Sequence, residues 1–184
     1  MDNGESSYRR FLMGDNEGLY EIICIYQTGL TLYLNSFVQN IHIAEDMAED
    51  TFLELVKKRP KYSGKSSFKT WLYAIGRNIT AVYLRKHKNP DVVPLESQEH
   101  LSDEKNIESE YIKSEQKRQV HTALHRLKLE YRQVLYHTYF EDLSISETAF
   151  ILKKSIKQIN NLLYSAKAAL KTELERSGFD YEKS

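Results

Sequence analysis

The sequence has few of the residues that form disulfide bonds, tight turns or membrane-spanning helices. Its 184 residues include one cysteine, Cys24, so no disulfide can form within the chain. No signal-peptide pattern precedes Cys24, and no stretch approaches the roughly 18 consecutive apolar residues of a membrane helix. We therefore expect a cytoplasmic protein without a membrane span. Three prolines and seven glycines favour helices with short connections, in one domain or two small ones.

The chain also lacks a net charge, because 26 Lys and Arg balance 26 Asp and Glu. A sum of zero at first argues against a nucleic-acid partner. The charges are segregated, however: residues 57–88 contain ten bases and no acid, residues 91–110 contain seven acids and one base, and residues 153–171 contain five lysines and no acid. These segments are either solvated helix faces or surfaces for charged partners.

Apolar residues recur at three- and four-residue steps in the first half of the chain. They predict helices over residues 19–41, 47–56 and 68–82, the first being one helix or two collinear ones interrupted near Gly29. Trp71 falls on the apolar stripe of the third helix and is expected in the core. Three such helices form one small domain.

Two capping boxes mark the second half of the chain. Ser144-x-x-Glu147 and, eleven residues later, Ser155-x-x-Gln158 each open a short helix, and Ala149 is a small residue where the two helices would cross. This pattern fits a helix-turn-helix, although helical hairpins without a DNA role use the same caps. Residues 112–127 and 131–139 suggest two further helices.

The expected fold class is therefore all-α, with two small helical domains joined by a flexible acidic linker, the C-terminal one containing the helix-turn-helix. The expected boundaries are a tail over residues 1–14, a helical domain over 15–88, the linker over 89–108, a helical domain over 109–176 and a tail over 177–184.

The predicted second helix carries like charges four residues apart. Glu45 with Glu49, and Asp46 with Asp50 and Glu54, each cost roughly 0.2–0.5 kcal/mol in an isolated helix. Acids in a first turn complement the helix dipole, but Asp50 and Glu54 lie too far along the helix for that. The face is either a surface for a basic partner or a merely solvated one.

The third helix and the loop before it carry bases mixed with an aromatic residue and small polar groups. Such a mixture suits single-stranded nucleic acid, because phosphate charge and base stacking are then satisfied by different side chains. The residues that lie off the apolar stripe are Tyr62, Ser66, Ser67, Lys69, Tyr73, Arg77 and Asn78.

Evidence for an enzyme is weak. Among six histidines, only His121 and His125 have a spacing that could hold a metal, and no matching Cys or carboxylate motif accompanies them. Cys24 lies beside the first apolar stripe, where a packing role is expected, and no glycine-rich phosphate loop exists. We expect no catalytic residue, no metal and no cofactor.

Three collinear motifs carry a resemblance to a known family. They read AEDMAEDTFL at residues 44–53, FKTWLYAIGRN followed by YLRK within residues 68–86, and L-x-x-x-x-R-x-V-L followed by LSISETAFIL within residues 127–152. The ordered set resembles the bacterial RNA polymerase sigma factors of the extracytoplasmic-function (ECF) group, over roughly residues 15–175.

The resemblance implies a transcription initiation factor that binds core RNA polymerase, through the clamp helices of its largest subunit and its flap, and binds promoter DNA. It implies polymerase contacts from Asp46, Glu49, Asp50, Phe52 and Glu54, the acids having no internal counter-charge. It implies minus-10 contacts from Lys58, Tyr62, Ser66, Lys69, Arg77 and Asn78, with a flipped base near Tyr62. It implies minus-35 contacts from Ser155, Lys157, Gln158, Asn160, Asn161, Tyr164 and Lys167. The acidic linker would run through the polymerase channel, and an anti-sigma factor is a common further partner that no residue here identifies.

Four positions depart from the family pattern. Val82 replaces a usual Asp, Lys153 replaces the Gly of the turn and thereby implies a strained backbone or a different turn, and Asn160 and Leu162 replace Lys and Arg. Fewer phosphate contacts predict weaker, less salt-sensitive duplex binding. The alternative is a stand-alone helix-turn-helix regulator or a sigma-like accessory protein.

Overall fold

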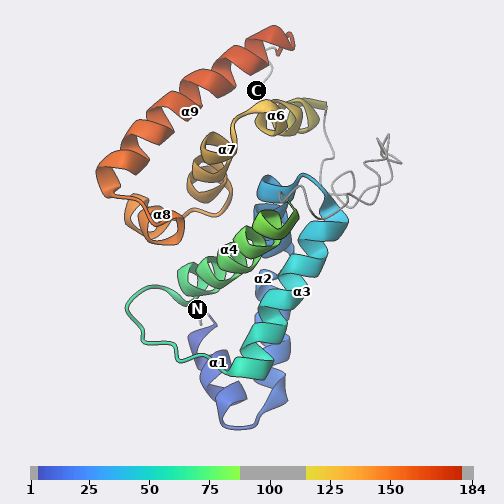
Figure 1. The fold of residues 1–184 in the computed structure, drawn as a ribbon, viewed down its shortest axis with the longest axis vertical. Helices are drawn as coiled ribbons and strands as arrows, with labels where there is room; N and C mark the ends of the chain where they lie inside the picture. The colour runs from blue at the N-terminus through green and yellow to red at the C-terminus, as the bar shows by residue number, and fades with distance from the viewer. Residues whose placement is uncertain (1–3, 88–114, 180–184) are drawn as a thin grey trace.

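The computed structural model describes residues 4–87 and 115–179, and every regular element in these two ranges is helical (Figure 1). The first range contains α1 (Glu5–Leu12), α2 (Asn16–Val38), α3 (Ile41–Lys58) and α4 (Phe68–His87). The second contains α6 (Glu115–Arg126), α7 (Leu129–Leu135), the π-helical turn η1 (Tyr136–Phe140), α8 (Ile145–Leu152) and α9 (Ile156–Arg176). The all-α expectation is confirmed. The expected linker, residues 89–108, lies outside the described residues.

Local signals explain where the helices begin and end. The side chain of Asp15 accepts a hydrogen bond from the backbone of Glu17 to open α2, and Asn40 does the same for Ile43 to open α3. α2 runs through Gly29 without a break, so the first stripe is one helix. α3 ends at Arg59, which has left-handed backbone angles and precedes a proline.

The core of the N-terminal domain lies where the apolar stripes of α2, α3 and α4 meet. Leu30 and Leu34 of α2, Leu55 of α3 and Leu72 of α4 are fully buried. Each such side chain stabilises the fold by about 1.5–3 kcal/mol relative to an exposed one. Trp71 is half-buried at the edge of this core.

Residues 5–12, assigned to a tail in the sequence analysis, instead form α1. Tyr8 and Phe11 are buried, and the Tyr8 hydroxyl donates a 2.7 Å hydrogen bond to the Pro60 carbonyl. α1 crosses α2 so closely that a Cβ atom added at Gly18 would lie 2.1 Å from the Ser7 carbonyl oxygen. Cys24, expected to pack inside, is exposed on α2.

Both predicted capping boxes form in the C-terminal domain. Ser144 with Glu147 opens α8, and Ser155 with Gln158 opens α9. Lys153 ends α8 with φ 54° and ψ 45°, a left-handed backbone that is strained for a residue with a Cβ atom, which is the first of the two alternatives expected at this turn. α9 has 21 residues and is therefore not the short helix that was expected. Its buried Ile159 packs into the domain core.

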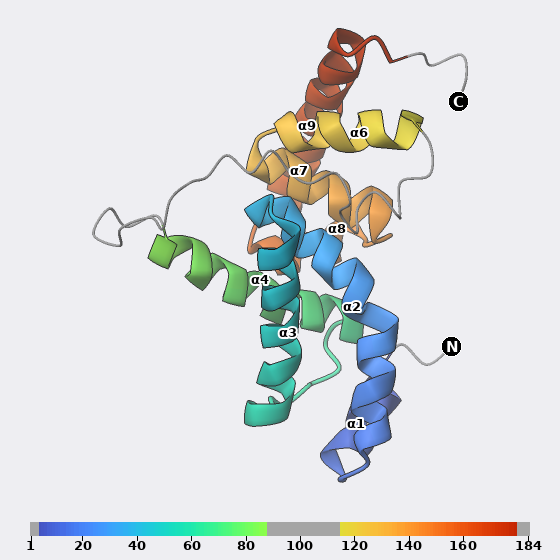
Figure 2. The same ribbon diagram turned by 90° about the vertical axis from the view of Figure 1, so that its right-hand side faces the viewer.

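The two domains pack directly against each other. α8 packs against α4, and α7 and η1 contact α2 (Figure 1 and Figure 2). Tyr33, Tyr73 and His137 are all buried where these elements meet. None of the helices in the described part of the chain is long and apolar enough to cross a membrane.

Candidate functional site

One face of α3 is an exposed acidic stripe. Asp46, Glu49 and Asp50 are exposed, and none of them forms an ion pair with a residue in the described ranges. Leu53 and Val56 continue the same face at helical spacing, and both are exposed. We call these five residues the α3 stripe. Its apolar end was missed in the sequence analysis, although the steps from 46 to 49, 53 and 56 indicate one helix face.

Two residues expected on this surface behave differently. The Glu54 carboxylate lies 2.7 Å from the Lys58 ammonium one turn later, so the expectation that Glu54 has no internal counter-charge is wrong. Phe52 is only 6% exposed, because it points into the core. Its side chain therefore supports α3 from inside and is not part of the surface.

Tyr62 is held in an aromatic cluster next to the basic loop. Its ring lies 5.6 Å from that of Phe68 and 5.3 Å from that of Trp71, and its hydroxyl donates a hydrogen bond to the Ser66 carbonyl. Burial raises the pKa of Tyr62. The ring is half-buried, so one part of it packs against the aromatic cluster and the other part is accessible to solvent.

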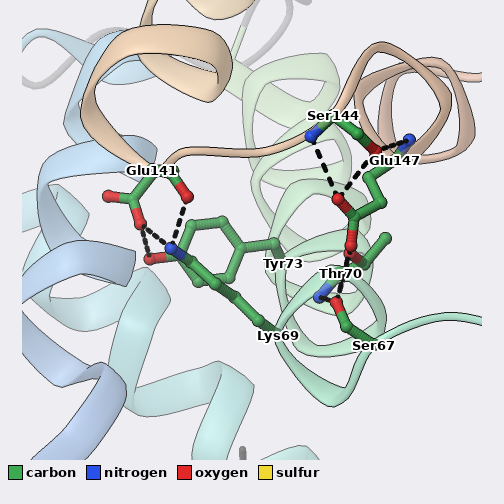
Figure 3. Close-up of polar contacts among 7 residues, drawn as sticks. All are labelled: Ser67, Lys69, Thr70, Tyr73, Glu141, Ser144 and Glu147. Carbon is green, nitrogen blue, oxygen red and sulfur yellow. Dashed lines mark hydrogen bonds and ion pairs between the residues drawn. The ribbon is translucent and has the colours of Figure 1, made fainter.

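Lys69 contacts Glu141 of the C-terminal domain, Arg77 lines a cleft together with residues of that domain, and Asn78 is exposed. The Lys69 ammonium donates to the Glu141 carbonyl over 2.7 Å and lies 2.8 Å from the Glu141 carboxylate (Figure 3). Arg77 is half-buried, and its Nε atom has no hydrogen-bond partner among the described residues.

Two hydroxyl groups at the start of α4, one just before the helix and one in its first turn, make a second set of contacts with the C-terminal domain. The Ser67 and Thr70 hydroxyls donate to one oxygen of Glu147 over 2.9 and 2.8 Å (Figure 3). The other Glu147 oxygen accepts from the backbone and side chain of Ser144. Burial alone raises the pKa of Glu147, but these hydrogen bonds outweigh it and lower the pKa to about 2.

Glu141 is the second carboxylate in this contact. It accepts a 2.8 Å hydrogen bond from the Tyr73 hydroxyl. Burial and then the Glu141 charge raise the pKa of Tyr73 far above its ordinary value. Neither carboxylate was singled out for this role in the sequence analysis, because Glu147 already had a local explanation as a capping residue.

A cleft of about 610 Å³ adjoins these contacts between the domains. Arg77, Arg85 and Lys154 give its wall positive charge, and Leu84 and Leu129 are among its apolar lining residues. The Lys154 ammonium is paired with Glu130 over 2.8 Å.

The N-terminal half of α9 presents a polar face to solvent. The residues on this face are Lys157, Asn160, Asn161, Tyr164 and Lys167, all of them exposed. Tyr164 is 80% exposed, and the Lys167 ammonium lies 5.4 Å from the centre of the Tyr139 ring. Ser155 and Gln158 are engaged with each other in the capping box, while Leu162 is half-buried.

Within residues 4–87 and 115–179, no three His, Cys, Asp or Glu side chains are grouped so that they could hold a metal ion. His121 instead contacts the rings of Tyr136 and Phe140.

The sequence matches two family descriptions, Sigma-70 region 2 over residues 25–89 and Sigma-70 region 4 over residues 117–170. The chain belongs to the sigma-70 family. We therefore call α1–α4 the region 2 domain and α6–α9 the region 4 domain. The presence of both regions favours a sigma factor over a stand-alone helix-turn-helix regulator.

Similar proteins place the chain in the ECF group, as the sequence motifs suggested. The RNA polymerase sigma factor YlaC of Bacillus subtilis is 27% identical over 170 residues, covering 90% of this chain and 96% of that protein. The ECF RNA polymerase sigma factor SigW of the same organism is 25% identical over 171 residues, covering 88% and 91%.

Solved structures share the fold. CnrH, in complex with the cytosolic domain of CnrY, matches with a TM-score of 0.69 and 18% identity over 95% of this chain and 99% of that one. The sigma factor RpoE of Bartonella quintana, in complex with the anti-sigma factor NepR, matches with a TM-score of 0.65 and 21% identity over 85% and 96%.

Proposed function

We propose that this sigma factor binds core RNA polymerase through the α3 stripe, holds the minus-10 strand on the region 2 domain and reads the minus-35 duplex through α9. The observation that carries the proposal is the α3 stripe, whose acids stay exposed without ion pairs to described residues. Like charges on neighbouring turns repel each other, and a basic partner would add an attraction that outweighs this repulsion.

The stripe combines charge with apolar area. Asp46, Glu49 and Asp50 would steer a basic surface of the polymerase, such as its clamp helices, into place. Leu53 and Val56, about 40% exposed, would then lose contact with water at the centre of the interface. Phe52 would support α3 by packing in the core, and Glu54 would hold Lys58 in place through their ion pair.

The minus-10 strand would meet the basic loop and α4. Tyr62, Ser66, Arg77 and Asn78 offer a half-buried ring, a hydroxyl, a guanidinium and an amide at the positions that the family motif assigns to this contact. A base flipped from the duplex costs a few kcal/mol of stacking, which a preformed aromatic cluster would offset.

The minus-35 element would meet the exposed face of α9. Asn160, Asn161 and Tyr164 can contact base edges, while Lys157 and Lys167 would contact phosphates. Ser155 and Gln158 would position the helix through its capping box. Two lysines give a small electrostatic contribution, so the duplex affinity of the protein alone would be low.

The proposed role requires binding and strand separation but no covalent chemistry, so we do not assign an enzyme activity. It places the protein with RNA polymerase in the bacterial cytoplasm. One solved relative is in complex with the anti-sigma factor NepR and another with the cytosolic domain of CnrY, and we expect a partner of the anti-sigma class here.

The test is charge reversal on the α3 stripe. The double substitution Asp46→Lys and Asp50→Lys should weaken binding to core polymerase about tenfold or more, because repulsion would replace attraction. Glu17→Lys with Glu175→Lys is the matched control, since both acids are exposed on other helices and the net charge changes equally. Fluorescence anisotropy with labelled protein gives the affinity, and circular dichroism checks the helices. Equal affinities for the two double variants would refute the docking surface.

A further inference from the structure

We propose that the cleft between the two domains is a binding site for an organic polyphosphate of nucleotide size, such as a nucleoside triphosphate. Arg77 and Arg85 of α4 line the cleft on one side, and residues of α7, of α8 and of the turn after α8 line it on the other. The proposal goes beyond polymerase and promoter binding and does not depend on them, because Arg85 and the lining residues of the region 4 domain have no part in those assignments.

The first step is the unbalanced positive charge of the cleft. Lys154 and Glu130 both line it, and they neutralise each other in a 2.8 Å ion pair. Neither Arg77 nor Arg85 forms an ion pair with a residue in the two described ranges. Two guanidinium groups therefore line the cleft without a counter-charge from the described part of the chain, which favours an anionic ligand.

The second step is the state of the Arg77 guanidinium. Arg77 is half-buried, and its Nε atom is fully buried without an acceptor among the described residues. Burial of a charged donor without an acceptor is unfavourable. A phosphate group beside the guanidinium would supply the missing charge, and arginine suits this role because its planar group donates two parallel hydrogen bonds to phosphate oxygens.

The third step is the spacing along α4. Arg77 and Arg85 are eight residues apart, which is about 12 Å along a helix axis and slightly more than two turns. Ala81 lies between them on the same face and also lines the cleft. Its side chain is a single methyl group, so the space between the two arginines stays open. Two guanidinium groups in this arrangement can bind different phosphate groups of one ligand.

The fourth step is the apolar part of the cleft. Leu84 of α4, Leu129 of α7 and Leu152 of α8 all line it, and Gln133 adds an amide group. Its volume of about 610 Å³ lies within the range of small-molecule sites, roughly 300–1,000 Å³. An inorganic anion would leave the apolar lining in water, whereas a nucleotide would cover it with its base. The lining therefore favours an organic polyphosphate over an inorganic one.

The first experiment measures binding to the full chain by isothermal titration calorimetry, in a buffer without divalent cations. The probes are ATP and GTP, and inorganic triphosphate and adenosine serve as partial ligands. At least one nucleotide should bind about tenfold or more tightly than either partial ligand, because only the nucleotide contacts both the guanidinium groups and the apolar lining. Absence of binding by both nucleotides would overturn the proposal. Equal affinities for the nucleotides and inorganic triphosphate would overturn the organic ligand.

The second experiment locates the site by removing one charge. Arg85→Gln should weaken nucleotide binding about tenfold to a hundredfold, the loss typical of a charged hydrogen bond. Lys86→Gln is the matched control, because it removes the same charge from the neighbouring exposed residue, which does not line the cleft. It should change the affinity less than about twofold, since an exposed charge is screened by salt.

A third variant tests the cleft without a change in charge. Ala81→Leu should fill the space between the arginines and weaken nucleotide binding about tenfold or more, because the larger side chain would overlap the ligand. Ala168→Leu, at an exposed position of α9, should leave the affinity unchanged. Circular dichroism checks that both variants keep their helices, as expected for exposed positions. Equal losses in Arg85→Gln and Lys86→Gln, with no effect of Ala81→Leu, would assign the binding to the overall positive charge of α4 and overturn the cleft as the site.

Discussion

Lys153 adopts a backbone conformation that is unfavourable for a residue with a side chain. It ends α8 in the left-handed region, and its backbone N–H donates to the Phe150 carbonyl over 3.3 Å. This conformation costs a residue with a Cβ atom roughly 1–2 kcal/mol, whereas glycine adopts it without that cost. The turn of the helix-turn-helix therefore keeps its shape at some cost in stability.

We predict that Lys153→Gly raises the free energy of unfolding by about 0.5–1 kcal/mol, because relief of the backbone outweighs the greater freedom of glycine in the unfolded chain. Urea denaturation followed by circular dichroism measures the change. Lys171→Gly, at an exposed interior position of α9, should instead lower it by about 1 kcal/mol. Destabilisation by both substitutions would contradict the account of the turn.

Residue-level features were predictable from the sequence where the signal was local. The capping boxes at Ser144 and Ser155 depend on neighbours in the chain, and both are present. At Lys153 the family resemblance left a strained backbone and a different turn open, and the backbone is in the left-handed region. Glu141 and Tyr73 could not be paired in this way, because they are 68 residues apart and nothing in either local pattern indicates the other. The same limit applies to Thr70 and Glu147.

At the scale of helices, the crossing of α1 and α2 sets the N-terminal end of the region 2 domain. Gly18 lets the two backbones touch, and Tyr8 and Phe11 fill the space beneath α1. A helix of eight residues has little stability of its own, so α1 depends on this packing. That dependence also explains why periodicity predicted α2, α3 and α4 but not α1, which offers two large apolar residues to the core.

We predict that Gly18→Ala lowers the free energy of unfolding by about 1–3 kcal/mol, because the added methyl group would overlap the Ser7 carbonyl and push α1 away. Chemical denaturation measures the loss in the free energy of unfolding, and faster hydrogen exchange over residues 5–12 would show that the loss arises at α1. Gln27→Ala, on the exposed side of the same helix, is the control and should change stability by less than about 0.5 kcal/mol. Equal effects of the two substitutions would rule out the close crossing as the cause.

At the scale of the whole molecule, we call the arrangement in which the two domains pack against each other the closed form, and one in which they have separated the open form. The closed form depends on His137, whose buried ring nitrogens have no hydrogen-bond partner among the described residues. Burial, reinforced by the charges of Arg77 and Lys69, lowers the pKa of His137 to about 3. Tyr33 covers the ring from α2, and the Glu141 carboxylate is held by Lys69 and Tyr73. The closed form therefore accepts only the neutral ring.

We predict that acid favours the open form. His137 regains an ordinary pKa near 6.5 when exposed, so its stabilisation of the closed form is complete above pH 6.5 and is lost progressively toward pH 3. Between pH 7.5 and 5.5 the closed-to-open ratio should fall about tenfold. Energy transfer between dyes at Cys24 and at Lys171→Cys reports the ratio.

His137→Phe is the control for this effect, since it keeps an aromatic ring against Tyr33 but cannot take up a proton. Its closed-to-open ratio should be nearly constant across the same interval. The low pKa of Glu147 does not interfere, because that carboxylate loses its contribution only as the pH falls below 4.5 toward 2. An equally steep response in His137→Phe would assign the pH dependence to another group.

Glu147 serves both domains with one carboxylate, holding the start of α8 with one oxygen and the hydroxyls of Ser67 and Thr70 with the other. A substitution of Glu147 would therefore disturb two contacts at once, the start of α8 within the region 4 domain and the contact of that domain with the start of α4. Ser67 has the matching double role on the other side of the contact, because its hydroxyl donates to Glu147 and also accepts the Thr70 backbone N–H at the start of α4. Each of these two helices therefore begins at a side chain that also joins the two domains.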